Sequence, residues 1–391
     1  MKKIIFLYPF FLAMTILTFS CQEGKNTQNS KEAEDLHVIV NKNRPENPAL
    51  SLKFEEDLSL TREGWWPSKV LVDDEENIYV SQVKGNMIYK FDSKGNEILK
   101  KEFPKGQGPG EFTSMAPCFS SDGRFFIYDR RQLRLTIMNS NYEIQNTLKF
   151  NEYRWVFHLD SEANMYFWVV KFLPRTKDAN RVVLTKFSLS GEIIHEVFEY
   201  IWSIYAVDGK RIEHKHPLYK PYGMYKIDSH DNMYYAMSDK YEINVVSPEG
   251  IKLKRIVKKG QSRKITGKDI KKAMSFFPFA SKPSNMIIIP EFMPYIADFF
   301  ILKNEYLLVI TFENNFNKRT LAGDLFDENG VFQARVEVPK YYRWFDLMGP
   351  GESNAIVRKN HFYTIESDET EENFYVKRYK IIWNGTRAGK H

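Results

Sequence analysis

The chain has 391 residues, of which 43% are hydrophobic and 15% aromatic, so it is long and apolar enough to bury a large core. Its formal net charge is +6 with the basic residues scattered, which is too small a surplus to predict a nucleic-acid-binding protein. It has two cysteines, Cys21 and Cys118, which excludes a disulfide-rich fold. Cys118 stands among apolar residues typical of a strand, which predicts a buried, inert thiol rather than a nucleophile.

The N-terminus has the pattern of an export signal. Two lysines follow Met1, residues 4–19 are uncharged and mostly apolar, and Ser20 precedes Cys21. The apolar run is shorter than the ~20 residues that span a bilayer comfortably. This segment resembles a bacterial lipoprotein signal, which implies cleavage after residue 20 and a lipid on Cys21. Thr18 departs from the usual aliphatic residue at that position, and an ordinary secretory signal or an uncleaved anchor remain alternatives.

Residues 21–49 are polar and charged, with few large apolar groups. Such a segment buries too little surface to offset its ordering entropy, so the sequence predicts a flexible tether. The folded domain is expected to begin at residue 50.

Six degenerate repeats follow, each with a short aromatic strand after a turn rich in Asp, Asn, Gly or Ser. The strands are Asn77–Val80, Arg124–Ile127, Asn164–Phe167, Asn232–Tyr235, Glu305–Leu308 and His361–Thr364. A second turn recurs in most repeats, and it ends sixteen residues after the strand centre in three of them. Strands separated by such turns predict antiparallel hairpins.

A repeated four-stranded sheet is typical of a β-propeller, because each sheet buries its faces only against its neighbours. We therefore predict an all-β, six-bladed β-propeller of four-stranded antiparallel blades over residues 50–383, with a tail over 384–391. The sixth repeat lacks an outer strand, and Ser51–Leu60 is free to supply it and close the ring. A seventh blade would have to lie in residues 260–294, but Ile265–Met274 predicts a short capped helix there.

Two glycine-rich segments, Lys105–Phe112 and Gly349–Glu352, predict tight crossovers between blades rather than a phosphate-binding loop. Together with the repeated hairpin and the leader, they resemble a family of bacterial six-bladed β-propeller lipoproteins related to NHL-repeat and TolB-like propellers. The resemblance implies a ring fold and an exported, membrane-tethered location. It implies no reaction.

Some six-bladed relatives, the gluconolactonase-type and strictosidine-synthase-like propellers, are enzymes that work at the central channel. The oxygen-bearing groups predicted near the channel of this chain are Asp298, Glu352 and Asn354. They are too few to predict a metal site, and the histidines lie in different registers of the repeat. The sequence thus predicts no metal, no cofactor and no catalytic residue.

Aromatic and cationic side chains gather in the crossovers. Tyr-Arg-Trp occurs at residues 153–155 and again at 342–344. With neighbouring aromatics they give a candidate ligand-binding set of Trp65, Trp66, Arg154, Trp155, Tyr222, Arg343 and Trp344, to which the channel residues are added. Such groups suit a sugar, an aromatic metabolite, a carboxylate or a peptide. The alternative is that they fill the crevices between blades.

The sequence therefore predicts a monomeric, non-enzymatic binding or scaffold module for a protein, peptide or glycan of the cell envelope. We expect the protein to be anchored to a bacterial membrane, the outer membrane, by its lipid alone. The alternative is a channel-centred hydrolase or lyase of the propeller type.

Overall fold

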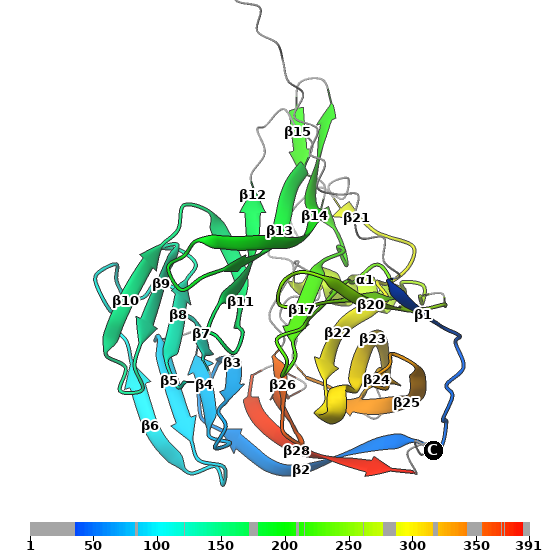
Figure 1. Ribbon diagram of the computed structural model, residues 1–391, viewed down its shortest axis with the longest axis horizontal. Helices are drawn as coiled ribbons and strands as arrows, with labels where there is room; N and C mark the ends of the chain where they lie inside the picture. Colours follow the sequence, from blue (N-terminus) through cyan, green and yellow to red (C-terminus); the bar gives the residue numbers. More distant parts are fainter. Residues whose placement is uncertain are drawn as a thin grey trace, which may run out of the picture. The chain divides into compact units, whose positions relative to one another are not determined.

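The computed structural model describes residues 36–82, 85–120, 122–171, 179–208, 211–214, 216–260, 262–276, 287–315, 320–341, 354–368, 370 and 372–385. Within these ranges the chain forms six small antiparallel sheets arranged as a six-bladed β-propeller with four strands in each blade (Figure 1). The prediction of the fold is confirmed.

The first three blades follow one another along the chain, and in each the strands run from the innermost to the outermost in chain order. Blade 1 consists of β3 (Pro67–Val72), β4 (Ile78–Gln82), β5 (Met87–Phe91) and β6 (Glu97–Glu102). Blade 2 consists of β7 (Ala116–Phe119), β8 (Phe125–Asp129), β9 (Arg134–Met138) and β10 (Ile144–Lys149). Blade 3 consists of β11 (Tyr153–Leu159), β12 (Met165–Lys171), β13 (Ala179–Phe187) and β14 (Ile193–Asp208), extended by β15 (Arg211–His214).

The last three blades involve both ends of the chain. Blade 4 consists of β17 (Gly223–Ile227), β18 (Met233–Met237), β19 (Glu242–Val246) and β20 (Lys252–Lys258), with β1 (His37–Asn41) added outside. Blade 5 consists of β22 (Ile296–Ile301), β23 (Leu307–Asn315), β24 (Thr320–Phe326) and β25 (Phe332–Pro339), with the 3-10 turn η2 (Lys303–Glu305) after β22. Blade 6 consists of β26 (Ala355–Arg358), β27 (His361–Ser367), β28 (Phe374–Asn384) and β2 (Ser51–Thr61).

A long crossover joins blades 4 and 5. It contains helix α1 (Gly267–Phe276), which confirms the helix predicted there, and β21 (Ile287–Ile288), which pairs with β16 (His216–Pro217). No helix in the described part of the chain has both the length and the apolar character needed to cross a membrane.

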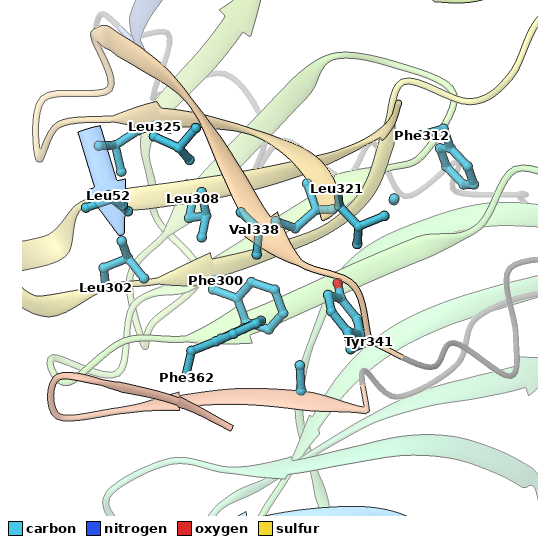
Figure 2. Close-up of a cluster of buried hydrophobic side chains, with 14 of the residues drawn as sticks. Leu52, Phe300, Leu302, Leu308, Phe312, Leu321, Leu325, Val338, Tyr341 and Phe362 are labelled. Carbon is cyan, nitrogen blue, oxygen red and sulfur yellow. The ribbon is translucent and has the colours of Figure 1, made fainter. Parts of the chain in front are cut away.

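The core lies between blades rather than within them. The described residues form six clusters of buried hydrophobic side chains, and each cluster draws on two neighbouring blades. Figure 2 shows the cluster between blades 5 and 6, where the rings of Phe300 and Phe362 meet edge to face at 5.1 Å. Each blade therefore buries its faces against its neighbours, and its stability depends on them.

The repeated turns have a common hydrogen-bond pattern that explains the repeat in the sequence. In blade 3, Asp160 Oδ1 accepts the backbone N–H of Asn164, and the Asn164 amide donates to Asp160 Oδ2. Ala163, between them, has φ +62°. This left-handed backbone conformation lets the chain reverse within four residues, and Asp, Asn and Gly recur in the turns because they adopt it readily. The same Asp-to-Asn contacts occur at Asp73–Asn77, Asp92–Asn96 and Asp228–Asn232.

Replacing the turn glycine Gly330 by alanine should destabilise the protein by about 2 kcal/mol or more. Gly330 has φ +83°, where a Cβ costs about 1 kcal/mol, and the new methyl group would lie 2.7 Å from Ile256 Cγ1 of the next blade. Gly123→Ala is the matched control, because Gly123 has φ +78° but no atom within 4 Å of the added Cβ. Urea unfolding should show a larger loss at Gly330; equal losses would rule out the contact between blades.

The ring is closed by the N-terminal strand, as predicted. Strand β2 pairs antiparallel with β28 from Ser51 opposite Asn384 to Thr61 opposite Tyr375. Across this pair Lys377 Nζ donates to Glu56 Oε2 at 2.9 Å, and Arg378 Nε donates to Asp57 Oδ1 at 2.9 Å. The first described strands of the chain therefore hold the last one.

The structure differs from the expectation of a free tether up to residue 49. Strand β1 lies parallel to β20, with His37 opposite Lys254. Asn41 is buried; its amide donates to Gly330 O at 2.9 Å and accepts the N–H of Phe332 at 2.8 Å, both in blade 5. The short β-branched run Val38–Val40 pairs with a blade edge that would otherwise be open. The sequence did not predict this strand because most of the residues around it are polar.

Residues 37–61, which we call the N-terminal strap, thus contact three successive blades. The strap pairs with β20 of blade 4 through β1, and the N–H groups of Glu46 and Asn47 donate to Phe332 O and Gln333 O of blade 5. It ends as β2 in blade 6 (Figure 1).

Candidate functional site

A pocket opens between blades 4 and 5, where the chain leaves β20 for the long crossover. We call it the blade 4–5 pocket, and its volume is about 80 Å³. It is lined by Asn43, Tyr241, Lys258, Lys259, Gly260, Ser262, Arg263, Pro294, Tyr295, Thr311, Phe312, Glu313, Asp324 and Arg335. The strap, both blades and the crossover all contribute to it.

A buried carboxylate forms its floor. Asp324 on β24 is fully buried, and its Oδ2 accepts from Lys258 Nζ at 2.7 Å and from Tyr241 OH at 2.5 Å. Lys258 is itself only 7% exposed, and its ammonium lies 4.1 Å from the centre of the Phe332 ring. Burial and the Asp324 charge raise the pKa of Tyr241 well above its ordinary value, so the phenol stays protonated and donates.

A second ion pair, on the crossover, forms one wall. The Arg263 guanidinium donates to both oxygens of Asp269 at 2.7 and 2.8 Å, and its Nε donates to Phe312 O. Asp269 also accepts from the N–H and hydroxyl of Thr266 and belongs to the first turn of α1. The Thr266 hydroxyl accepts the Asp269 N–H in return, so the two residues form a reciprocal cap that fixes the start of the helix.

The acid stability of this wall should depend on Asp269. Hydrogen bonds from Arg263 hold the pKa of Asp269 well below its usual value of 3.8. Because the folded-state pKa is depressed, the stabilisation is complete above about pH 4 and is lost as the pH falls through the folded pKa. Melting temperatures measured from pH 5 to pH 2 should fall less steeply in Asp269→Asn than in the parent. Asp239→Asn, at an exposed position, is the control and should keep the parent slope.

The rim carries the exposed charges. Arg335 on β25 pairs with Glu313 at 2.6 Å, and its Nε lies 4.0 Å from Asp324 Oδ1. The side chains of Arg335 and Glu313 are 42% and 54% exposed, and Lys259 and Asn43 are exposed beside them. The lining has four cations and two carboxylates, and Asp269, which pairs with Arg263 behind the wall, is a third carboxylate. The local excess is therefore one positive charge, which favours an anion.

The predicted aromatic set lies mostly in the packing between blades. Trp65 is 3% exposed and meets Tyr89 edge to face at 6.0 Å, and Trp66 lies 5.0 Å from Phe374. Trp155 is 8% exposed in the cluster between blades 3 and 4. Tyr222 is 7% exposed and donates its hydroxyl to Ala297 O of blade 5 at 2.7 Å. These placements match the alternative in which such rings fill crevices, and a ligand role for them stays a prediction.

Arg154 packs against two aromatic rings. Its guanidinium carbon lies 3.6 Å from the centre of Phe150 and 4.0 Å from that of Phe187, and Glu152 is 3.8 Å away. Burial lowers the pKa of Arg154 to about 10, so it remains charged at neutral pH. Two aromatic rings therefore lie against the guanidinium.

Asp298 and Asn354 are the predicted channel residues that the structure describes, and each has partners of its own. Asp298 accepts from Tyr341 OH at 3.1 Å and from the Phe299 N–H, and Lys226 lies 3.7 Å away. Asn354 is 5% exposed, and its backbone carbonyl accepts from Ile365. Among the described residues no three His, Cys, Asp or Glu side chains gather as metal ligands would. Cys21, Arg343, Trp344 and Glu352 lie outside the described residues.

The blade 4–5 pocket was not predicted from the sequence. Lys258 and Asp324 are 66 residues apart and follow no motif. The one available signal was a charged residue inside an apolar strand, as in Leu321–Leu325, because a charge at such a position needs a partner.

Comparison with known proteins supports the fold alone. Neither protein-family models nor curated proteins gave a match to this chain. Among solved structures, a protein of Bacteroides fragilis described as exported matches with a TM-score of 0.51 and 12% identity, over 88% of this chain and 99% of that one. A DUF4221 family member from Bacteroides vulgatus matches with a TM-score of 0.51 and 11% identity, over 85% of this chain and 99% of that one. Virginiamycin B lyase from Staphylococcus aureus matches with a TM-score of 0.43 and 12% identity, over 85% and 100%.

Proposed function

We propose that this chain is an exported propeller, anchored to the bacterial outer membrane by a lipid on Cys21, that binds a protein, peptide or glycan of the cell envelope without catalysing a reaction. The leader supports the location, and the blade 4–5 pocket supports binding. The observation that supports binding most directly is an exposed rim, with two cations and one carboxylate, around a buried ion pair. The ion pair with Glu313 holds Arg335 in place before the ligand arrives, which lowers the entropy cost of binding.

Two experiments test this. Cells given a labelled fatty acid should label the parent protein and not Cys21→Ser; labelling of both, or of neither, would overturn the lipid anchor. For binding, an immobilised Cys21→Ser chain should retain a component of envelope extracts. That capture should fall in Lys259→Glu, which reverses a rim charge, and persist in Lys252→Glu at the opposite end of β20. Capture that is equal in both variants, or absent from the parent, contradicts a binding role for the pocket.

A channel-centred hydrolase or lyase is the second candidate. It is favoured by the Lys226, Asp298 and Tyr341 side chains, which meet between inner strands of blades 4 and 5 and the crossover to blade 6. Turnover of a lactone or ester panel that disappears in Asp298→Asn, while folding is kept, would support this activity. An inactive parent chain would exclude these substrates.

A further inference from the structure

We propose that the blade 4–5 pocket binds a uronic acid, a sugar that carries a carboxylate. This inference rests on the proposed binding function and names the ligand class for the same pocket. It follows from which charged groups are already paired, which donors remain, and the chemistry of the lining.

The carboxylates at the pocket are already paired. Asp324 accepts from Lys258 and Tyr241, and Glu313 pairs with Arg335. Asp269, behind the wall, is bound on both oxygens by Arg263. A cationic ligand would have to displace one of these partners, and displacing Lys258 would leave a buried charge unpaired, which is costly.

Donors at the rim remain available. The Lys259 ammonium and the Asn43 side-chain amide are exposed, and neither has a hydrogen-bond partner in the described part of the chain. Both belong to the same part of the lining, because Asn43 Oδ1 is 3.9 Å from the position of a Cβ on Gly260, the residue that follows Lys259. The backbone supports this placement, since the Lys259 N–H donates to Asn41 O at 3.0 Å. With the half-exposed Arg335 opposite, these groups suit the two oxygens of a carboxylate.

The rest of the lining suits a sugar better than a peptide. Ser262 and Thr311 line the pocket, and their hydroxyls already donate to Pro294 O and Ala322 O, so they can only accept hydrogen bonds from a ligand. Tyr295 contributes a partly exposed ring whose hydroxyl donates to Gly260 O at 3.3 Å. Aromatic rings pack against the apolar face of sugars, while hydroxyls and amides bond to their rims. A volume of about 80 Å³ is below the ~300 Å³ of small-molecule sites, so the pocket fits the carboxylate end of the sugar and leaves the ring at the mouth.

Titration calorimetry of the Cys21→Ser chain with four probes tests the inference. Glucuronate should bind, and its affinity should fall as salt is raised, because an exposed ion pair is screened. Glucose and glucuronamide, which lack the charge, should bind at least tenfold more weakly. N-acetylglycine, which carries a carboxylate without the sugar, should also bind at least tenfold more weakly. Equal binding of the uncharged sugars, or tighter binding of N-acetylglycine, would overturn the assignment.

Variants at the rim locate the site. Lys259→Gln and Asn43→Ala should each weaken glucuronate binding about fivefold or more, and neither removes a described side-chain contact needed for folding. Lys252→Gln is the matched control, because Lys252 is an exposed lysine at the far end of β20, the strand that Lys259 follows; it should change the affinity less than twofold. Unchanged binding in both rim variants would overturn the site. If the parent does not bind glucuronate but still captures a component of envelope extracts, the uronic acid assignment is wrong and the proposed function stands. If it captures no component either, the proposed function is wrong as well.

Discussion

A chain that begins at residue 62 is expected to lose its cooperative unfolding transition, whereas a chain that begins at residue 37 keeps the parent melting temperature. The shorter chain lacks β2, and with it the outer strand of blade 6 and the buried side chains of Leu50, Leu52 and Leu60. Burying three leucines contributes roughly 5–9 kcal/mol, which is comparable to the whole stability of a typical domain at about 5–15 kcal/mol.

Two further chains make this result specific. A chain that begins at residue 50 keeps β2 but loses β1 and the hydrogen bonds of Glu46 and Asn47 to blade 5, so it should melt below the parent but still cooperatively. A synthetic peptide of residues 50–61, added to the chain that begins at 62, should restore part of the transition by pairing with β28. If the chain from 62 melts like the parent, the ring does not depend on its N-terminal strand.

The second large effect is expected at the floor of the blade 4–5 pocket. Asp324→Ala should destabilise the protein by about 3–5 kcal/mol, because it leaves the buried Lys258 ammonium without a counter-charge and the Tyr241 hydroxyl without its acceptor. Equilibrium urea unfolding, with the slope of the transition checked, measures this loss.

Two further variants show whether the loss of stability comes from leaving a buried charge unpaired. Glu313→Ala removes an exposed partner from the same network and should cost less than about 1 kcal/mol. The double variant Lys258→Met/Asp324→Leu replaces both buried charges with apolar groups and should recover much of the loss. A cost for Asp324→Ala as small as that for Glu313→Ala would show that solvent reaches the pair.

The fold was largely predictable because its signal is repeated. In every blade the second strand begins within three residues of the predicted aromatic strand, from β4 at Ile78 to β27 at His361. The addition of Ser51–Leu60 to blade 6 as its outer strand was predictable as well, since the sixth repeat lacked a strand in the sequence. Strand β1 was missed because its pairing with β20 leaves no repeat in the sequence, and its three apolar residues stand in a polar segment.

The candidate site was much less predictable. Aromatic and cationic residues in the crossovers suggested a ligand-binding face, but the same residue types also pack against one another inside the protein, as Arg154 does against Phe150 and Phe187. Composition alone does not tell which side of a strand faces solvent. The pocket, in contrast, is assembled from the strap, two blades and a crossover, and it has no local spacing that a sequence could display.

The pairing of β2 with β28 also sets an order on synthesis. Glu56 and its partner Lys377 are 321 residues apart, so β2 has no partner strand until nearly the whole chain is available. Any chain that lacks β28 leaves β2 unpaired, and unpaired strand edges favour aggregation. The ring can therefore close only when the C-terminal strand β28 is present.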